Sequence, residues 1–267
     1  MSDALADDTR NTVRDHYAKV STGNAGCAPG CCAVMPVDQS KMLGYSEAER
    51  ELGEGADLGL GCGNPTAIAS LRPGESVLDL GSGGGFDSFL AARAVGPTGK
   101  VIGVDMTPEM ITLSRGNARK LKAANVEFRL GEIEHLPVAD GTVDVILSNC
   151  VINLSPEKQA VFDEAFRVLR IGGRLAISDV VAVAPIPDAL RTQAAAIAGC
   201  IGGAALLDDV KQMLAKAGFK SIEVTIAPRS EEIVNSWMAG ASQYIASATI
   251  EARRGAEKAC CEPGCCP

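Results

Sequence analysis

The sequence has little positive charge. Its 267 residues include 25 lysines and arginines against 33 aspartates and glutamates, which gives a net charge of −8 at pH 7 and a pI of about 4.9. Phosphate-rich partners bind to cationic surfaces, and this composition offers no such field. We therefore expect neither nucleic acid nor an anionic membrane among the partners of the chain.

Long hydrophobic runs are also missing. The most apolar stretch, around residues 194–207, is rich in alanine and glycine and is shorter than the roughly 20 residues of a membrane span. The first eight residues are acidic and polar, whereas a secretory signal is basic and then apolar. A hydrophobic content of 46% and a charged content of 22% exclude the disordered class. These features predict a cytoplasmic globular protein.

Cysteine is abundant, with ten residues in the chain. Because the cytoplasm keeps thiols reduced, we expect them to serve as metal, metalloid or redox groups rather than as a disulfide framework. They form an N-terminal group, a C-terminal group and three single residues: Cys27, Cys31 and Cys32; Cys260, Cys261, Cys265 and Cys266; and Cys62, Cys150 and Cys200. The two terminal groups share a C-x-P-G-C-C pattern.

The middle of the chain alternates strand and helix signals. Buried strands are expected at residues 76–80, 101–105, 126–130, 143–148 and 174–178, with helices at 86–95 and 108–123. This alternation predicts an α/β fold, a Rossmann-like parallel sheet with helices on both faces. Ligands of such sheets bind beyond the carboxyl ends of the strands.

The flanking segments differ from the middle in character. We expect a helical, loop-rich arm without strands over residues 1–70 and a cofactor-binding domain over 71–182. An α+β substrate-binding portion is expected over 183–253, with an Ala-rich helical insert at 189–199, a helix at 207–217 and strands at 219–226 and 243–251. Residues 254–267 form a Cys-rich tail.

A glycine-rich turn follows the first strand. It reads Asp79-Leu80-Gly81-Ser82-Gly83-Gly84-Gly85, and Asp105 ends the next strand, where a carboxylate can bind ribose hydroxyls. A dinucleotide fingerprint requires glycine at position 86, which is Phe86 here. The remaining G-x-G-x-G spacing resembles that of class I S-adenosylmethionine-dependent methyltransferases.

That resemblance implies a set of cofactor-binding residues. The glycine loop would face the methionine part, Asp105 the ribose, and Met106, Glu132 and Ile133 the adenine. The whole expected set is Asp79, Gly81, Ser82, Gly83, Gly85, Asp105, Met106, Glu132, Ile133 and Asn149.

The three single cysteines all fall in turns. Cys62 lies in a glycine-rich loop, Cys150 directly follows the fourth strand, and Cys200 precedes an Ile-Gly-Gly helix stop. Three thiols around one pocket mouth favour a trigonal site for a soft ion. Each residue alone could equally be a small buried hydrophobe.

Four segments together are similar to the arsenite S-adenosylmethionine methyltransferase family. They are residues 58–65, 77–87, 148–154 and 198–203, within a resemblance that spans about residues 12–253. The resemblance implies methylation of trivalent arsenic, supplied as arsenite or its thiol conjugates and held by thiolates of Cys62, Cys150 and Cys200. An N-terminal cysteine of the family, which forms a transient disulfide, matches Cys31 or Cys32, of which we favour Cys32. Thioredoxin or glutathione would then act as the reductant.

This reaction would need no histidine base, because trivalent arsenic keeps a lone pair that can attack a methyl group directly.

Three alternatives remain open. A small-molecule C- or O-methyltransferase would require a base near Asn149 and Cys150, and none is present there. A thiol-based metalloid sensor or chaperone without catalysis fits the C-x-P-G-C-C repeats but not the cofactor loop. Structural zinc would have to use adjacent cysteines, outside the usual ligand spacing.

Overall fold

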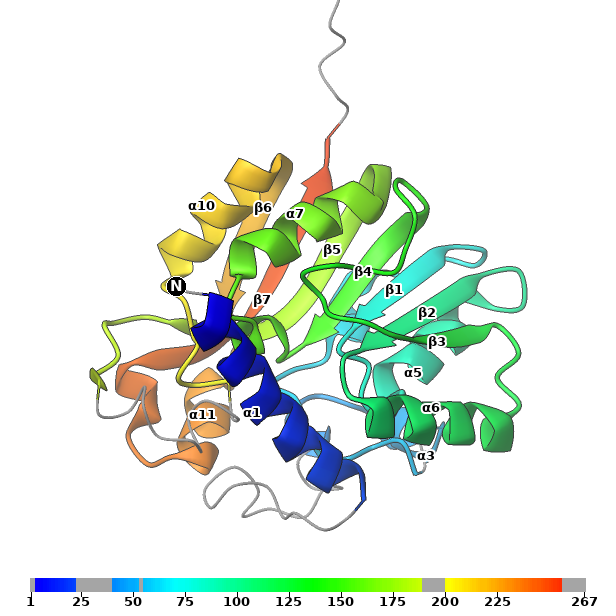
Figure 1. Cartoon of the computed structure of the whole chain (residues 1–267), viewed down its shortest axis with the longest axis horizontal. Helices are drawn as coiled ribbons and strands as arrows, with labels where there is room; N and C mark the ends of the chain where they lie inside the picture. Colours follow the sequence, from blue (N-terminus) through cyan, green and yellow to red (C-terminus); the bar gives the residue numbers. More distant parts are fainter. Residues whose placement is uncertain (1–2, 23–39, 53–54, 189–199, 256–267) are drawn as a thin grey trace, which may run out of the picture.

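The computed structural model describes residues 3–22, 40–52, 55–188 and 200–255. Seven strands form one sheet in the order β3-β2-β1-β4-β5-β7-β6 (Figure 1). The strands are β1 (Ser76–Leu80), β2 (Lys100–Asp105), β3 (Val126–Leu130), β4 (Val143–Asn149), β5 (Leu169–Ala182), β6 (Phe219–Ile226) and β7 (Ile245–Arg254). The helices are α1 (Asp3–Ser21), α3 (Glu47–Leu52), α4 (Pro65–Ala69), α5 (Phe86–Val95), α6 (Pro108–Leu121), α7 (Lys158–Val168), α10 (Leu207–Ala217) and α11 (Ser230–Trp237), with short 3-10 turns at η1 (Ile152–Leu154) and η2 (Ala241–Gln243).

The first five strands run parallel, and β7 lies antiparallel between β5 and β6. The predicted α/β class with a Rossmann-like sheet is confirmed. β7 pairs with β5 along nine positions, from Arg174↔Arg253 to Ala182↔Ile245. The sheet therefore continues across the boundary expected at residue 182, and the division into four segments stays a prediction.

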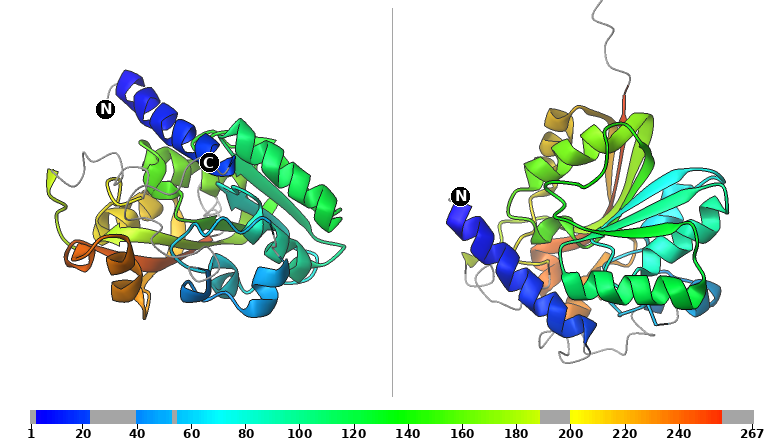
Figure 2. Two further views of the ribbon diagram at one scale, coloured as in Figure 1. Left: turned by 90° about the horizontal axis from the view of Figure 1, so that it is seen from below. Right: turned by 45° about the vertical axis from the view of Figure 1, so that its right-hand side comes forward.

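Both faces of the sheet are covered because its central strands are apolar on both sides. In β1, Leu78 and Leu80 pack with the core that contains Phe162 of α7 and Leu214 of α10. Val77 packs on the other face, with Ala91 of α5. Figure 2 shows these helices on opposite sides of the strands. Such continuous apolar runs are what a buried parallel strand requires.

The expected element boundaries agree closely with the structure in most places. β1, β3, α5, α10 and β6 span the ranges predicted for them, whereas β5 extends well beyond residues 174–178 at both ends. Helices α7 and α11 were not individually expected. The Ala-rich insert at 189–199 and most of the C-terminal tail lie outside the described residues. Among the residues described, no helix is long and apolar enough to cross a membrane.

Candidate functional site

The glycine loop between β1 and α5 is held in a shape that side chains would prevent. Gly81 has φ +65°, and a Cβ there would lie 2.4 Å from Cγ2 of Val151. A Cβ on Gly84 would lie 2.7 Å from the carbonyl oxygen of Ala56. Gly85 is the N-cap of α5, with φ +95°. The loop therefore needs glycine both for its left-handed backbone and for its close approach to neighbouring chain segments.

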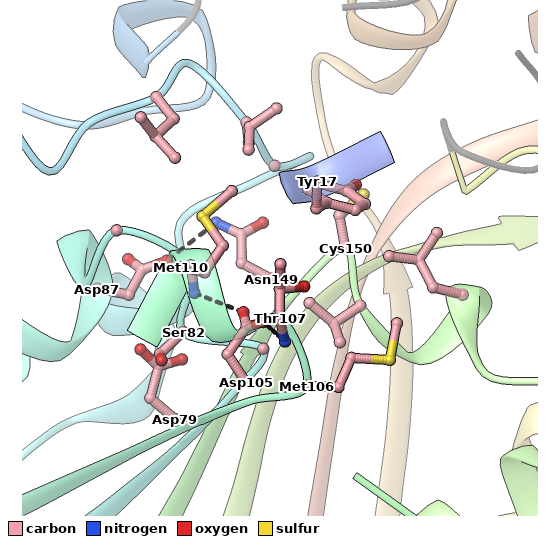
Figure 3. Close-up of a pocket in the computed structure, with 18 of the residues that line it drawn as sticks. Tyr17, Asp79, Ser82, Asp87, Asp105, Met106, Thr107, Met110, Asn149 and Cys150 are labelled. Atoms are coloured by element: carbon pink, nitrogen blue, oxygen red, sulfur yellow. Dashed lines mark hydrogen bonds between the residues drawn. The ribbon is translucent and has the colours of Figure 1, made fainter. Parts of the chain in front are cut away.

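Asp105 ties the end of β2 to this loop. Its carboxylate accepts hydrogen bonds from the N–H of Gly83 at 2.9 Å and of Thr107 at 2.8 Å (Figure 3). Burial raises the pKa of this carboxyl, and the two backbone donors oppose that rise. Asp105 thus lines the pocket at the end of β2 and anchors the loop, and the ribose contact expected for it stays a prediction.

Two further buried carboxylates line the same pocket. Asp79 accepts from the hydroxyl of Ser88 at 2.6 Å, and burial, followed by the charge of Asp87, raises its pKa well above the usual value. Asp87 accepts from the Tyr45 hydroxyl at 2.6 Å and from the Asn149 amide at 3.1 Å, and burial raises its pKa to about 6. Concentrated negative charge of this kind favours a cationic ligand.

Helix α1 covers part of the pocket from the opposite side. Val13 and Tyr17 line it, as does Arg10, and α1 packs against α6 (Figures 1 and 2). Arg10 pairs with Glu157 and lies 3.5 Å from Glu134. Helix α1 of the N-terminal arm thus covers one side of the pocket. Residues 3–22 contain no strand, and the extent of the arm over residues 1–70 stays a prediction.

An apolar rim lies next to Asp105. Met106, Met110 and Ile133 line the pocket there, together with Glu134 (Figure 3). Glu132 and Gly85, both expected to bind cofactor, are not among the lining residues. The Glu132 carboxylate instead pairs with Arg14 at 3.2 Å and lies 3.8 Å from Arg10. The acidic residue that lines the pocket here is Glu134, two positions further on.

The three single cysteines come together just beyond the end of β4, beside Ser178 and Asp179 of β5. Cys150 and Cys200 line the pocket, whereas Cys62 is fully buried beside them. Cys200 donates its thiol hydrogen to the carbonyl oxygen of Cys150 at 2.6 Å. The Cys62 and Cys200 thiols are both close enough to the Cys150 thiol to shift its pKa. Cys62 and Cys200, which are 88 and 50 positions away from Cys150 in the sequence, thus both lie next to it in the structure.

Backbone geometry fixes each thiol. Cys150 and Cys200 both adopt the left-handed region, with φ of +59° and +65°, which is costly for a side-chain-bearing residue and is typical of functional sites. The Cys150 N–H donates to Ser178 at 2.8 Å. The carbonyl oxygen of Cys62 accepts from the Ser247 hydroxyl at 2.6 Å.

The three thiols all have raised pKa values. Burial raises the pKa of Cys62 to about 11 and that of Cys150 well above its usual value. The hydrogen bond with Cys150, together with burial, raises the pKa of Cys200 likewise. Asp179 lies near them, and burial raises the pKa of its carboxyl to about 6.

Asn149 connects the carboxylates with the thiols. Its amide nitrogen donates to the Asp87 carboxylate at 3.1 Å and to the Gly63 carbonyl at 3.0 Å, and its oxygen accepts from the Cys62 N–H at 3.0 Å. A Cβ on Gly61 would collide with this amide at 2.7 Å. The sequence predicted only cofactor contact for Asn149, whereas its side chain joins the two halves of the site.

Trp237 is a pocket residue that the sequence did not point to. It extends from α11 and lines the pocket together with Cys200. It is also the only tryptophan in the chain, so its fluorescence reports on this site alone. Cys32, expected as the redox partner, lies outside the described residues.

Comparisons with known proteins match the chain to methyltransferases. Residues 71–218 match a family described as "Methyltransferase domain". The arsenite methyltransferase of Halobacterium salinarum is 51% identical over 96% of this chain and 69% of its own length. That of Aquipseudomonas alcaligenes is 38% identical over 78% of this chain and 61% of its own length. Thus the chain spans about two thirds of the length of these curated relatives.

Solved structures give the same result. The crystal structure of an arsenic(III) S-adenosylmethionine methyltransferase from Chlamydomonas reinhardtii superposes with a TM-score of 0.60 at 31% identity, covering 87% of this chain and 76% of that one. A Haemonchus contortus phosphoethanolamine N-methyltransferase superposes with a TM-score of 0.65 at 18% identity, covering 84% of this chain and 61% of that one. The second likeness concerns the fold alone.

Proposed function

The chain belongs to the arsenite methyltransferase family, and we propose that it transfers a methyl group from S-adenosylmethionine to trivalent arsenic held by Cys62, Cys150 and Cys200. One observation carries this proposal. Cys150 and Cys200, with Cys62 buried beside them, line a pocket that buried carboxylates also line. A soft acceptor atom and a cationic methyl donor would therefore be neighbours.

The carboxylate end suits the donor. S-adenosylmethionine supplies an electrophilic methyl group on a sulfonium sulfur and carries a net positive charge. Asp87 offers negative charge, Asp79 and Asp105 offer acceptors, and the apolar surface of Met106 and Ile133 suits a purine base. The buried hydroxyl of Ser82 has no hydrogen-bond partner among the residues that the structure describes, as expected of a group that a ligand satisfies.

The thiol end suits the acceptor. Arsenous acid condenses with three thiols, so that three As–S bonds form and three water molecules leave. Arsenic keeps its lone pair in this trithiolate, and the lone pair is the nucleophile, so that no general base has to remove a proton. The fixed backbone of Cys150, which lines the pocket next to the other two thiols, would orient the lone pair toward the methyl group.

The raised thiol pKa values predict how arsenite affinity depends on pH. Both reactants are neutral between pH 7 and 8, since burial holds the Cys62 pKa at about 11, and condensation releases water and no net proton. We therefore expect the arsenite dissociation constant, followed by quenching of Trp237 fluorescence, to stay constant over that range. A steady tightening of about tenfold per pH unit would show that a free thiolate is required instead.

Cofactor affinity, unlike arsenite affinity, should fall as the pH is lowered. The Asp87 carboxyl has a pKa of about 6, and a cationic ligand binds the ionised form better, which lowers that pKa in the complex. Affinity is thus complete above pH 6 and is lost below it, by about tenfold between pH 7 and pH 5. Calorimetry would measure this, and Asp87→Asn should flatten the profile. An unchanged profile in that variant would assign the effect to another group.

Turnover would require electrons as well as methyl groups. Use of the arsenic lone pair leaves arsenic formally pentavalent, and two electrons return it to the trivalent state. We propose that Cys62 and Cys32 supply them by forming a disulfide, which thioredoxin or glutathione in the cytoplasm then reduces. Mass spectrometry of protein quenched during turnover would detect this disulfide, and its failure to accumulate when the reductant is withheld would contradict the redox step.

The defining experiment is methyl transfer from labelled S-adenosylmethionine to arsenite in the presence of a thiol. We expect methylated arsenicals from the wild-type chain and none from Cys62→Ser. If the chain binds both ligands and methylates neither arsenite nor methylarsenite, a thiol-based sensor becomes the better reading.

A further inference from the structure

Asp179 is a buried carboxylate for which methyl transfer has no use. It lies in β5, is 2% exposed, and forms no salt bridge with any residue that the structure describes. Its Oδ2 accepts one hydrogen bond, from the N–H of Ile152 at 3.0 Å, while Oδ1 accepts from the Asn153 amide at 2.8 Å and from the N–H of Val180 at 2.7 Å. Since a carboxylate oxygen has two lone pairs, Oδ2 keeps one for another partner.

The position of this carboxylate suggests that partner. One carboxylate oxygen of Asp179 and the sulfurs of Cys62 and Cys150 all lie within 4.8 Å of one another. A tetrahedral ion with bonds of about 2.0 to 2.3 Å spans ligand atoms roughly 3.5 Å apart. Movements of about an ångström would therefore bring the three atoms to one ion. The Cys62 and Cys150 thiols thus have two different neighbours, the Cys200 thiol and the Asp179 carboxylate.

We propose that Cys62, Cys150 and Asp179 form a second, overlapping site that binds a thiophilic divalent cation such as Cd²⁺ or Zn²⁺. Trivalent arsenic takes three sulfurs and keeps a lone pair, so it uses Cys200 and leaves Asp179 aside. A filled-shell divalent cation accepts mixed sulfur and oxygen ligands. The cation binds as two S–H bonds break, two metal–sulfur bonds and one metal–oxygen bond form, and two protons pass to solvent.

Charge favours such an occupant. Two thiolates and a carboxylate carry three negative charges, and a divalent cation leaves one, near the ammonium group of Lys158, whose charge acts on Asp179. Cation and arsenite would exclude each other, because both need the same two sulfurs. This last consequence rests on the proposed function, whereas cation binding itself does not.

The test uses the full chain with Cys62, Cys150 and Cys200 kept as the cluster cysteines. Serine replaces the other seven: Cys27, Cys31, Cys32, Cys260, Cys261, Cys265 and Cys266. CdCl₂ is titrated without arsenite or cofactor, and binding is followed by calorimetry and by Cd–thiolate absorbance. Asp179→Asn should raise the Cd²⁺ dissociation constant by at least about tenfold, because even a residue that only hydrogen-bonds a metal ligand is worth about 10- to 100-fold. The matched variant, Cys200→Ser, should leave it little changed, because the serine hydroxyl can still donate to the carbonyl oxygen of Cys150 as the Cys200 thiol does.

Arsenite gives the reverse pattern in the same two variants. Cys200→Ser should weaken arsenite binding, and Asp179→Asn should leave it little changed. If Cys200→Ser weakens Cd²⁺ binding and Asp179→Asn does not, the cation uses the arsenic ligands and the proposal is wrong. Failure of the arsenite arm alone would contradict the proposed function and leave the cation site standing.

X-ray absorption at the cadmium edge decides the case even if Asp179→Asn misfolds, because it needs no substitution at the site. We expect two sulfur ligands together with oxygen in the chain that carries all three cluster cysteines. Three sulfurs without oxygen would overturn the assignment of Asp179.

Discussion

Replacing Cys150 with serine is expected to slow arsenic methylation by at least about 100-fold. The Cys150 thiol lies next to both of the other thiols, and it lines the pocket. Oxygen is a poor substitute for sulfur toward a soft element, and a displacement of about 1 Å at a reacting centre can itself cost about 100-fold. Formation of methylarsenicals at saturating arsenite and cofactor measures this effect.

The loss in Cys150→Ser should be confined to the acceptor. Its cofactor dissociation constant should match that of the wild-type chain, because the carboxylate contacts do not include Cys150. Cys260→Ser is the matched control, a cysteine of the tail, and should retain the wild-type rate. Near-normal methylation by Cys150→Ser would remove the thiol cluster from the mechanism.

Replacing Asp105 with alanine is expected to raise the cofactor dissociation constant by about 100-fold. Asp105 is the acceptor for the N–H groups of Gly83 and Thr107, and a buried donor left without a partner costs about 1 to 3 kcal/mol. One such loss, at about 1.4 kcal/mol per factor of ten, together with a loosened glycine loop, accounts for the expected size. Calorimetric titration with S-adenosylmethionine measures it.

Asp144→Ala is the matched control for that substitution. Asp144 also accepts a backbone hydrogen bond, from Ser76 at 2.8 Å, and it pairs with Arg170, but it lies at the opposite end of the sheet from the pocket. Its removal should change cofactor affinity by less than about twofold. Equal losses in the two variants would mean that Asp105 acts through general stability and not through the cofactor loop.

The sequence predicted those parts of the site whose structure depends on residues close together in the chain. The apolar run before Gly81 marks a strand buried on both faces, and glycine is needed where φ is positive and a Cβ would collide with Val151. Cys150 follows its strand directly, so its place at the carboxyl edge could be predicted from the parallel sheet. The prediction that Cys62, Cys150 and Cys200 lie together depended on the family resemblance as well.

Contacts between distant parts of the chain left no such signal. Asn149 donates to the Tyr45 hydroxyl across 104 positions, and nothing near either residue in the sequence indicates this bond. Trp237 reaches the pocket from α11, a helix whose short amphipathic pattern was not recognised. Glu134 rather than Glu132 faces the pocket because the direction of a side chain after β3 depends on how the loop packs under α1.

A single-turnover reaction tests the central claim most directly. The chain whose only cysteines are Cys62, Cys150 and Cys200 is loaded with one equivalent each of arsenite and labelled S-adenosylmethionine, without external thiol, and then denatured with acid. If these three thiols hold arsenic beside the methyl donor, up to one labelled methyl per chain appears on arsenic, whatever its final oxidation state. If both ligands bind and no labelled methylarsenic forms, the three thiols are not the acceptor site.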